Sequence, residues 1–142
     1  MKRLDLRRHA KRNPAADELS PEGRVQAEDT GRKLPADYAV MFCSPAKRAA
    51  ETIAWFLRGS GQSVPPHRII EGLASDEEVA GAVESLFDLI PEGGSGLAVG
   101  HTPLIEKAVE RLSGVEVEPL GECEGVALTL EDGSYRVERL QR

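Results

Sequence analysis

The sequence predicts a three-layer α/β protein, in which helices cover both faces of a mostly parallel sheet and an antiparallel hairpin ends the chain. Short apolar runs typical of strands alternate with stretches of helical periodicity along the 142 residues. Proline follows serine or threonine at three places where a helix is expected to begin, and an Asp-Gly pair separates the last two apolar runs. No repeat or long linker divides the chain, so we expect one domain over residues 1–142.

Strands are predicted at short β-branched or aliphatic runs that end in glycine, proline, serine or a charged residue. The first surrounds Leu4 and Leu6, which alternate with polar neighbours. The others cover residues 38–43, 67–70, 96–99, 125–130 and 135–140. The last two flank the segment EDGS, and Asp-Gly between two alternating runs is a strong hairpin signal.

Four helices fit between these strands. Ser20, Ser44 and Thr102 each precede a proline, which suits a side-chain cap followed by proline at the first helical position. The third helix is expected to open with a capping box, Ser75-x-x-Glu78. One-sided apolar positions predict the buried faces. In chain order these are Ala27, Gly31 and Leu34; Ala50, Ile53, Ala54 and Leu57; Val79, Val83, Leu86 and Ile90; and Leu104, Ile105, Ala108, Val109 and Leu112.

The charge of the chain is unevenly distributed. The first twelve residues carry six basic side chains and one acidic one, whereas the rest carries 12 basic and 23 acidic. An acidic body with six aromatic residues argues against nucleic acid as a partner. The longest apolar run has six residues, too short for a membrane span. With no targeting pattern, we read Cys43 and Cys123 as reduced thiols and expect a cytoplasmic location.

Basic and imidazole side chains follow three of the predicted strands. Arg8 and His9 follow the first strand, Arg48 lies shortly after the second, and His101 and Thr102 follow the fourth. Ligands of open α/β sheets bind beyond the carboxyl ends of the strands, where helix N-termini also favour anions. The sequence therefore predicts a phosphate site, with Ser44 and Thr102 capping the helices that start there.

Four segments resemble the motifs of the histidine phosphatase superfamily, also called phosphoglycerate-mutase-like. Residues 6–10 (LRRHA) are similar to its L-x-R-H-G signature, with alanine in place of the commoner glycine. Residues 44–52 (SPAKRAAET) are similar to S-P-x-x-R-A-x-x-T, residues 99–102 (VGHT) to V-x-H, and residues 19–23 (LSPEG) to L-T-x-x-G. The small size resembles the SixA-type phosphohistidine phosphatases within the superfamily.

The resemblance implies a phosphatase in which His9 is the nucleophile and carries the phosphoryl group. Arg8, Arg48 and His101 would bind the phosphoryl oxygens as catalytic groups, with Thr102 as a further substrate-binding residue. Neutral imidazole is a competent nucleophile at pH 7, and guanidinium groups suit the charge of the transition state. No metal and no cofactor is required. Many members supply a general acid after the third strand, and Glu71 is the candidate here, although it falls in no clear motif.

The expected substrate is phosphohistidine on a protein, because an imidazole leaves more readily than an alkoxide and needs a general acid less. Two alternatives stay open. One is a phosphomonoesterase for a small phosphorylated metabolite with Glu71 as its acid, and the other is a non-catalytic module that binds phosphate or a phosphoprotein. A mutase is less expected in so short a chain.

Other chemistries fit the sequence less well. A zinc site built from His9, His67 and His101 lacks any short ligand spacing, so His67 is expected to be a surface or strand-edge residue. A cysteine phosphatase needs five residues between its cysteine and arginine, but only four separate Cys43 from Arg48. We therefore expect Cys43 to be a buried residue at a strand end.

Overall fold

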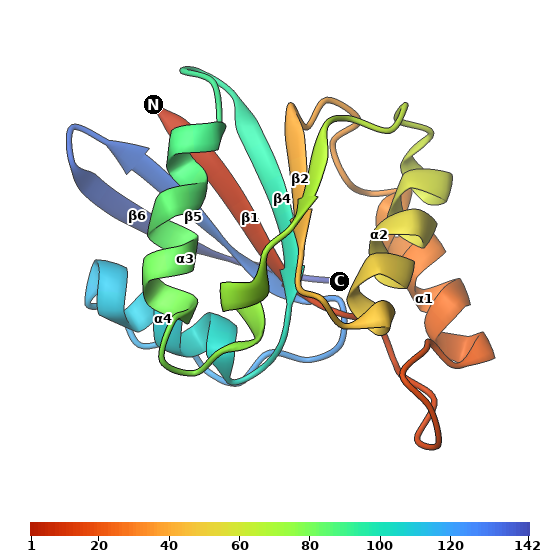
Figure 1. Ribbon diagram of the computed structural model, residues 1–142. Coiled ribbons are helices and arrows are strands. Elements are labelled where there is room, and N and C mark those ends of the chain that lie inside the picture. Colours follow the sequence, from red (N-terminus) through yellow and green to blue (C-terminus); the bar gives the residue numbers. More distant parts are fainter.

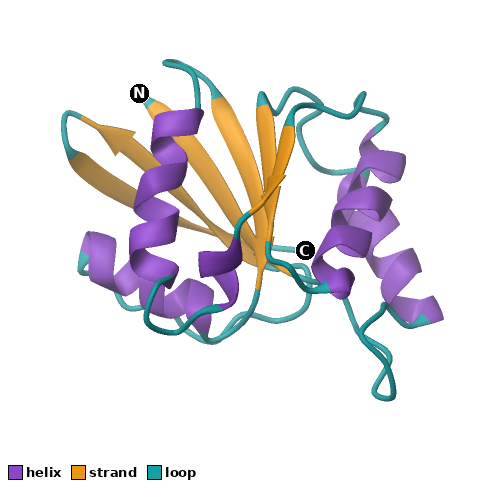
Figure 2. Ribbon diagram, viewed as in Figure 1, coloured by secondary structure: helices purple, strands orange, loops and turns teal.

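A six-stranded sheet runs through the centre of the protein, whose computed structural model describes residues 1–142. Figure 1 shows the twisted sheet between its helices, and Figure 2 separates strands from helices by colour. The spatial order is β3-β2-β4-β1-β5-β6. In chain order the strands are β1 (Lys2–Arg8), β2 (Val40–Cys43), β3 (His67–Ile69), β4 (Ser95–Gly100), β5 (Gly125–Glu131) and β6 (Ser134–Leu140). All six predicted strands are confirmed.

The sheet is mixed, with its parallel part at one side. Strands β3, β2, β4 and β1 pair in parallel, whereas β5 is antiparallel to both β1 and β6. The C-terminal hairpin is confirmed, and the antiparallel pairing of β5 with β1 is an addition to the prediction. Because the four parallel strands run in one direction, their carboxyl ends meet at the lower edge of the sheet in Figure 1.

Two helices cover each face of the sheet. One pair is α1 (Pro21–Gly31) with α2 (Lys47–Ser60), and the other is α3 (Val79–Leu86) with α4 (Leu104–Ser113). The short 3₁₀ turns η1 (Glu71–Ala74) and η2 (Phe87–Leu89) flank α3. The two pairs lie on opposite sides of the strands in Figure 2, which gives the predicted three layers. No helix is both long and apolar enough to pass through a bilayer.

Each face of the sheet has its own apolar core, and β2 contributes to both. Val40 and Phe42 join the core beneath α3 and α4, while Met41 and Cys43 join the core beneath α1 and α2. Successive strand residues point to opposite faces, so a strand covered on both sides is apolar throughout. This explains the unbroken apolar run at 38–43, and Cys43 is buried at the strand end, as predicted.

The helix starts differ in part from the prediction. Ser20 caps α1 as expected, its Oγ accepting from the Gly23 N–H at 3.0 Å. Helix α2, however, begins at Lys47 after an uncapped Ala46, and α4 begins at Leu104 after Pro103, also without a side-chain cap. The predicted caps Ser44 and Thr102 are therefore wrong, because both hydroxyls are bound elsewhere. In the third helix the Ser75 Oγ does accept from the Glu78 N–H at 3.2 Å, although the α-helix itself starts at Val79.

The buried face of α2 is also displaced from the predicted one. Its buried residues are Ala49, Thr52 and Phe56. The apolar pattern does not reveal this stripe, because it includes the polar residue Thr52. The Thr52 hydroxyl can be buried because it accepts from the Ala10 N–H and donates to the Arg48 carbonyl. The four residues predicted to be buried instead line a hollow of about 280 Å³ between α2 and the β2–β3 edge: Ala50, Ile53, Ala54 and Leu57.

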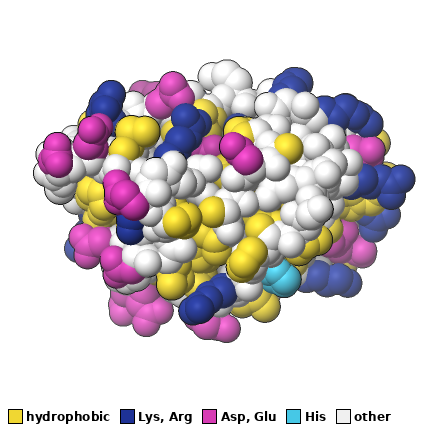
Figure 3. All heavy atoms as spheres, turned by 90° about the horizontal axis from the view of Figure 1, so that it is seen from above, with side chains coloured by type: hydrophobic (Ala, Val, Ile, Leu, Met, Phe, Trp, Pro, Cys, Tyr) yellow, Lys and Arg dark blue, Asp and Glu magenta, His cyan; other side chains and the backbone are white.

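The edge of the sheet opposite the carboxyl ends of the parallel strands has a mixed surface. In Figure 3, which views this edge, apolar side chains form a broken band toward one side, and charges of both signs surround it. Val64 and Ile69, just before and within β3, are two-thirds exposed. A hollow lined by histidine and arginine side chains lies at the other edge, where the parallel strands end.

Candidate active site

A hollow of about 620 Å³ opens at the carboxyl ends of β1, β2 and β4. Strand β1 is followed by His9 and strand β4 by His101, while Arg48 enters from the first turn of α2. Neighbouring parallel strands end side by side, which brings residues far apart in the chain to one place. The lining residues are Arg8, His9, Pro45, Ala46, Arg48, Ala74, His101, Thr102, Pro103 and Leu104.

His9 presents a free ring nitrogen to this hollow. Its Nδ1 lies 2.7 Å from the carbonyl oxygen of Ala10, which can only accept, so Nδ1 carries the proton and donates. The Nε2 atom therefore keeps its lone pair and accepts from the Arg48 Nε at 3.3 Å. Burial, reinforced by the positive charge of Arg48, lowers the pKa of His9. At neutral pH the ring is an uncharged nucleophile with a defined tautomer.

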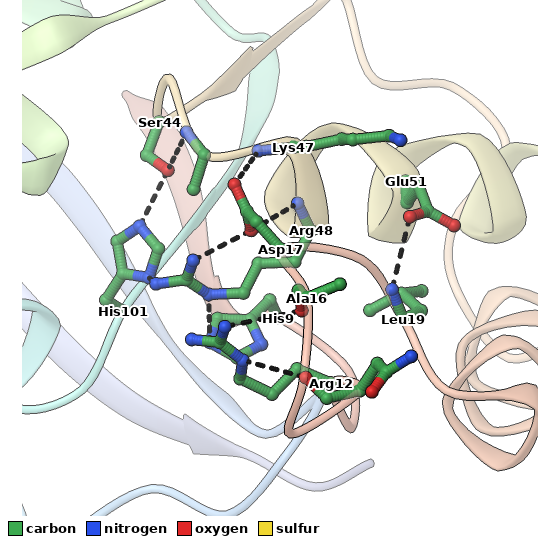
Figure 4. Close-up of polar contacts among 12 residues, drawn as sticks. His9, Arg12, Ala16, Asp17, Leu19, Ser44, Lys47, Arg48, Glu51 and His101 are labelled. Atoms are coloured by element: carbon green, nitrogen blue, oxygen red, sulfur yellow. Dashed lines mark hydrogen bonds and ion pairs between the residues drawn. The ribbon is translucent and has the colours of Figure 1, made fainter.

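Arg48 connects three side chains through one guanidinium group (Figure 4). Its Nε faces His9, its Nη2 lies 3.3 Å from the Nδ1 of His101, and its Nη1 donates to the Asp17 Oδ1 at 2.8 Å. The guanidinium is thus held along the floor of the hollow between the two imidazole rings.

His101 is held in turn by Ser44. Its Nε2 lies 2.7 Å from the Ser44 Oγ, while Nδ1 faces the guanidinium, which can only donate. Burial, together with the charge of Arg48, lowers the pKa of His101 to about 4. His101 is therefore neutral at pH 7, with its proton on Nε2. The rings of His9 and His101 are 5.4 Å apart, edge to face.

Arg8 and Thr102 complete the polar lining. Arg8 donates from Nη1 to the carbonyl of Leu120 at 2.9 Å, while its Nε is buried without a partner. The Thr102 hydroxyl donates to the carboxylate of Glu106. The peptide bond between Thr102 and Pro103 is cis. Because Thr102 is engaged with Glu106, its hydroxyl is turned toward α4 rather than capping it.

Glu71, the predicted candidate for a general acid, is not brought into the hollow. It begins η1 as an exposed residue, and Ala74 from the same turn lines the hollow in its place. His67 lies in β3, exposed, and borders the separate apolar hollow beside α2. No cluster of three or more histidine, cysteine or carboxylate side chains has a geometry suited to a metal ion.

Two residues hold the site in ways that the sequence did not indicate. Ser44 was interpreted as a helix cap, although its place next to a strand end was a usable signal. Asp17 lies in the loop between β1 and α1, where nothing in the local pattern distinguishes it from the neighbouring Glu18. Its pairing with Arg48, 31 positions away, arises from the tertiary fold.

The lining is rich in hydrogen-bond donors and has no carboxylate. Arg8 and Arg48 supply positive charge, and the neutral rings of His9 and His101 lie beside the Arg48 guanidinium. Planar guanidinium groups bind phosphate oxygens in pairs, and a tetrahedral oxyanion suits such a donor set. The remaining lining residues are proline, alanine, threonine and leucine, so the rim is largely apolar.

Residues 6–75 match the model of the histidine phosphatase superfamily (branch 1). The matched segment begins within β1 and ends after η1, and it includes His9 and Arg48. Over these 70 of the 142 residues the chain is similar to the histidine phosphatase superfamily. No protein of curated function matches it by sequence.

Solved structures of similar fold cover nearly the whole chain. The protein histidine phosphatase SixA in complex with tungstate is 22% identical, with a TM-score of 0.72 over 97% of this chain and 96% of that one. A phosphoserine phosphatase from Entamoeba histolytica is 16% identical, with a TM-score of 0.76 over 100% and 98%. YhfR from Bacillus stearothermophilus is 17% identical, with a TM-score of 0.81 over 98% and 96%. At these identities the likeness establishes the fold.

Proposed function

We propose that this phosphatase removes the phosphoryl group from phosphohistidine on a protein, through a covalent intermediate on His9. The observation that carries the substrate class is the absence of a carboxylate among the residues that line the hollow. Phosphomonoester cleavage expels an alkoxide and gains from a proton donor, whereas a phosphoramidate can leave as imidazole without one. Hydrogen-bond donors that stabilise the phosphoryl oxygens therefore suffice for cleavage of a phosphoramidate.

In the first step the Nε2 lone pair of His9 attacks the phosphorus of the substrate. A bond forms between Nε2 and phosphorus, and the bond from phosphorus to the substrate's imidazole nitrogen breaks. When the other nitrogen of that imidazole is protonated, the leaving group departs as neutral imidazole, and no proton moves at the departing atom. The Nδ1 of His9 keeps its proton throughout and donates it in a hydrogen bond to the Ala10 carbonyl.

In the second step water attacks the phosphorus of phosphorylated His9. The bond to Nε2 breaks, the oxygen and both protons of the water leave with the phosphoryl group as dihydrogen phosphate, and His9 recovers its lone pair. Arg8, Arg48 and His101 surround the reacting group in both steps. We propose that the guanidinium groups of Arg8 and Arg48 stabilise the negative charge on its oxygens, which a loose phosphoryl-transfer transition state spreads over three atoms. His101, whose Nδ1 faces the Arg48 Nη2, would help to hold that guanidinium in place.

The rim supports a macromolecular substrate. Pro45, Ala46, Pro103 and Leu104 form the lining beyond the charged floor, and they offer few hydrogen-bond partners to a sugar or a nucleotide. An imidazole ring on the surface of a protein would reach the floor between these apolar side chains. The neighbouring structures include phosphatases named for small metabolites as well as SixA.

Trapping of the covalent intermediate tests the catalytic part of this proposal. Brief incubation with a ³²P-labelled phosphodonor and rapid quenching should leave a label on the protein that is acid-labile and base-stable. The His9→Ala variant should carry no label, whereas His67→Ala, in exposed β3, should label like the wild type. A wild-type protein that binds phosphate but neither labels nor turns over would support a non-catalytic binding module instead.

Substrate comparison tests the leaving group. We expect kcat/KM for a phosphohistidine peptide to exceed that for phosphoserine peptides and sugar phosphates by at least about 100-fold, because only the latter need a proton donor. The Glu71→Gln variant should retain wild-type activity on phosphohistidine. Equal activity on phosphomonoesters that is lost in Glu71→Gln would identify the protein as a phosphomonoesterase.

A further inference from the structure

We propose that Asp17 is a positioning residue that orients the guanidinium of Arg48 for phosphoryl transfer and acts only through Arg48. This inference rests on the proposed function of the same site. It comes from one juxtaposition: a carboxylate from the β1–α1 loop meets both the first turn of α2 and the arginine that faces His9 and His101 (Figure 4).

Asp17 makes three hydrogen bonds to two consecutive residues. Its Oδ1 accepts from the Arg48 Nη1 at 2.8 Å and from the Arg48 backbone N–H at 3.2 Å. Its Oδ2 accepts from the Lys47 backbone N–H at 2.9 Å. Both carboxylate oxygens are therefore engaged, and the side chain is tied to the backbone and the side chain of α2 together.

Helix α2 needs this contact because its own chain supplies no cap. Ser44 is bound to His101, and Ala46 at the N-cap has no oxygen to offer the free N–H groups. Asp17 provides that acceptor from another segment, and its negative charge lies at the positive end of the helix dipole. The hydrogen bonds from Arg48 and Lys47 hold the pKa of Asp17 at about 2, so the carboxylate is ionised at neutral pH.

The contact restricts Arg48 in the way that catalysis requires. An arginine side chain has many rotamers, and fixing one costs conformational entropy. With Nη1 held by Asp17, the other two nitrogens are directed at His9 and His101, the atoms between which the phosphoryl group would lie. The loop is itself anchored: buried Leu19 donates its N–H to Glu51 of α2, and Leu19 pairs with Arg12 in a short bridge.

Substitution of Asp17 by asparagine tests the ion pair with little change in shape. The carboxamide NH₂ must face either the Lys47 N–H or the guanidinium, so one side of the contact is lost. We expect kcat on phosphohistidine to fall about 10- to 100-fold, as misplacement of a reacting group by about 1 Å would produce. Glu22→Gln is the matched control, since it removes one negative charge from an exposed pair with Lys11 that is remote from Arg48.

A double-mutant cycle separates positioning from general structural damage. If Asp17 acts only through Arg48, Asp17→Asn should cost less than about twofold in kcat when Arg48 is already glutamine, whereas independent effects would multiply. Wild-type kcat and KM in Asp17→Asn, or fully multiplicative losses in the double variant, would overturn the proposal. The thermal midpoint of each variant identifies any loss that comes from unfolding.

The same four proteins of the double-mutant cycle can be compared by their dissociation constants for inorganic phosphate. Calorimetry measures these constants and does not depend on turnover. Asp17→Asn should change the dissociation constant for phosphate in the wild-type background and leave it unchanged within twofold in Arg48→Gln. If the wild type neither labels nor turns over, the proposed function fails while this coupling still decides the role of Asp17. An unchanged dissociation constant in Asp17→Asn refutes the positioning role in either case.

Discussion

At the scale of single residues, the hydroxyl of Ser44 holds a ring of the site instead of capping helix α2. Ser44 is only 1% exposed. Its Oγ lies against the His101 ring and also accepts from the Ala46 N–H at 3.3 Å. A serine before proline at a strand end has the pattern of a helix cap. Here the helix is capped by Asp17 instead, and the hydroxyl fixes the orientation of the ring.

Replacement of Ser44 by alanine should affect both activity and stability. The buried Nε2–H of His101 would lose its partner, which costs about 1–3 kcal/mol in the free energy of unfolding. The ring would also be free to turn, and we expect kcat to fall on the order of 10- to 100-fold. Urea denaturation and steady-state kinetics measure the two effects. Ser85→Ala, which removes an exposed hydroxyl from α3, is the control, and a Ser44→Ala variant that matches it would contradict this role.

Two charged residues of β1, Asp5 and Arg7, are buried, and each has hydrogen-bond partners. Arg7, on the second face of β1, donates to the carbonyls of Cys123 and Gln141 at 2.8 and 3.1 Å. Asp5, on the same face, accepts from Arg3 and from the hydroxyl of Tyr38. These partners explain how two charged side chains fit beneath the helices, since a buried charge needs compensating hydrogen bonds.

At the scale of elements, the crossing of α1 and α2 depends on two glycines. A Cβ on Gly31 would lie 2.9 Å from the Cα of Phe56, and one on Gly59 would lie 2.9 Å from the backbone nitrogen of Arg32. Both distances are too short for carbon to fit without movement of the backbone. The small-residue face predicted for α1 is therefore a surface of close approach between two helices, and it sets the place of α2 and of Arg48.

We expect Gly31→Ala and Gly59→Ala each to lower the free energy of unfolding by about 1–3 kcal/mol, because overpacking forces the backbones apart. The matched control is Gly81→Ala, at an exposed position of α3 where an added Cβ meets no atom within 4 Å. That substitution should raise the free energy of unfolding by about 0.5–1 kcal/mol through helix propensity. Urea denaturation of the three variants checks both signs, and a neutral Gly31→Ala would disprove the close crossing.

At the scale of the whole molecule, folding buries His9 and His101 in their neutral form next to the guanidinium group of Arg48. The pKa of His101 falls from 6.5 to about 4 and that of His9 falls in the same direction, because burial and nearby guanidinium groups oppose their protonation. Between these values the unfolded chain binds more protons than the folded one. The free energy of unfolding must then decrease as the pH falls from about 6.5 toward 4.

This pH dependence can be measured by urea denaturation at several pH values between 7.5 and 4. The His101→Asn variant lacks one of the two groups and should show a shallower decline over the same range. Below about pH 4 a second decrease in the free energy of unfolding should begin. The pH then approaches the lowered pKa of Asp17, and protonation of this carboxylate weakens its hydrogen bonds to α2. Parallel curves for wild type and His101→Asn would show that the histidine does not contribute.

Local pattern and long-range packing can now be distinguished in this protein. The order of strands and helices, the hairpin and the meeting of Arg8, His9, Arg48 and His101 followed from periodicity, turn residues and the rule that parallel strands end at one edge. Each of the patterns used for these predictions lies within a short stretch of the chain. The buried face of α2 depended instead on where α1 and Ala10 lie, because a buried Thr52 is satisfied only by that tertiary contact.

The position of the carboxylates was decided by tertiary structure alone. Glu71 has the chain position expected of an acid, yet η1 turns it to solvent, while Asp17 is carried to Arg48 by a loop with no distinctive pattern. Hydrogen bonds between residues about 30 positions apart leave no periodic trace in a sequence. Local order therefore determined which groups could form the phosphate site, and the packing of α2 against the β1–α1 loop decided how Arg48 is held within it.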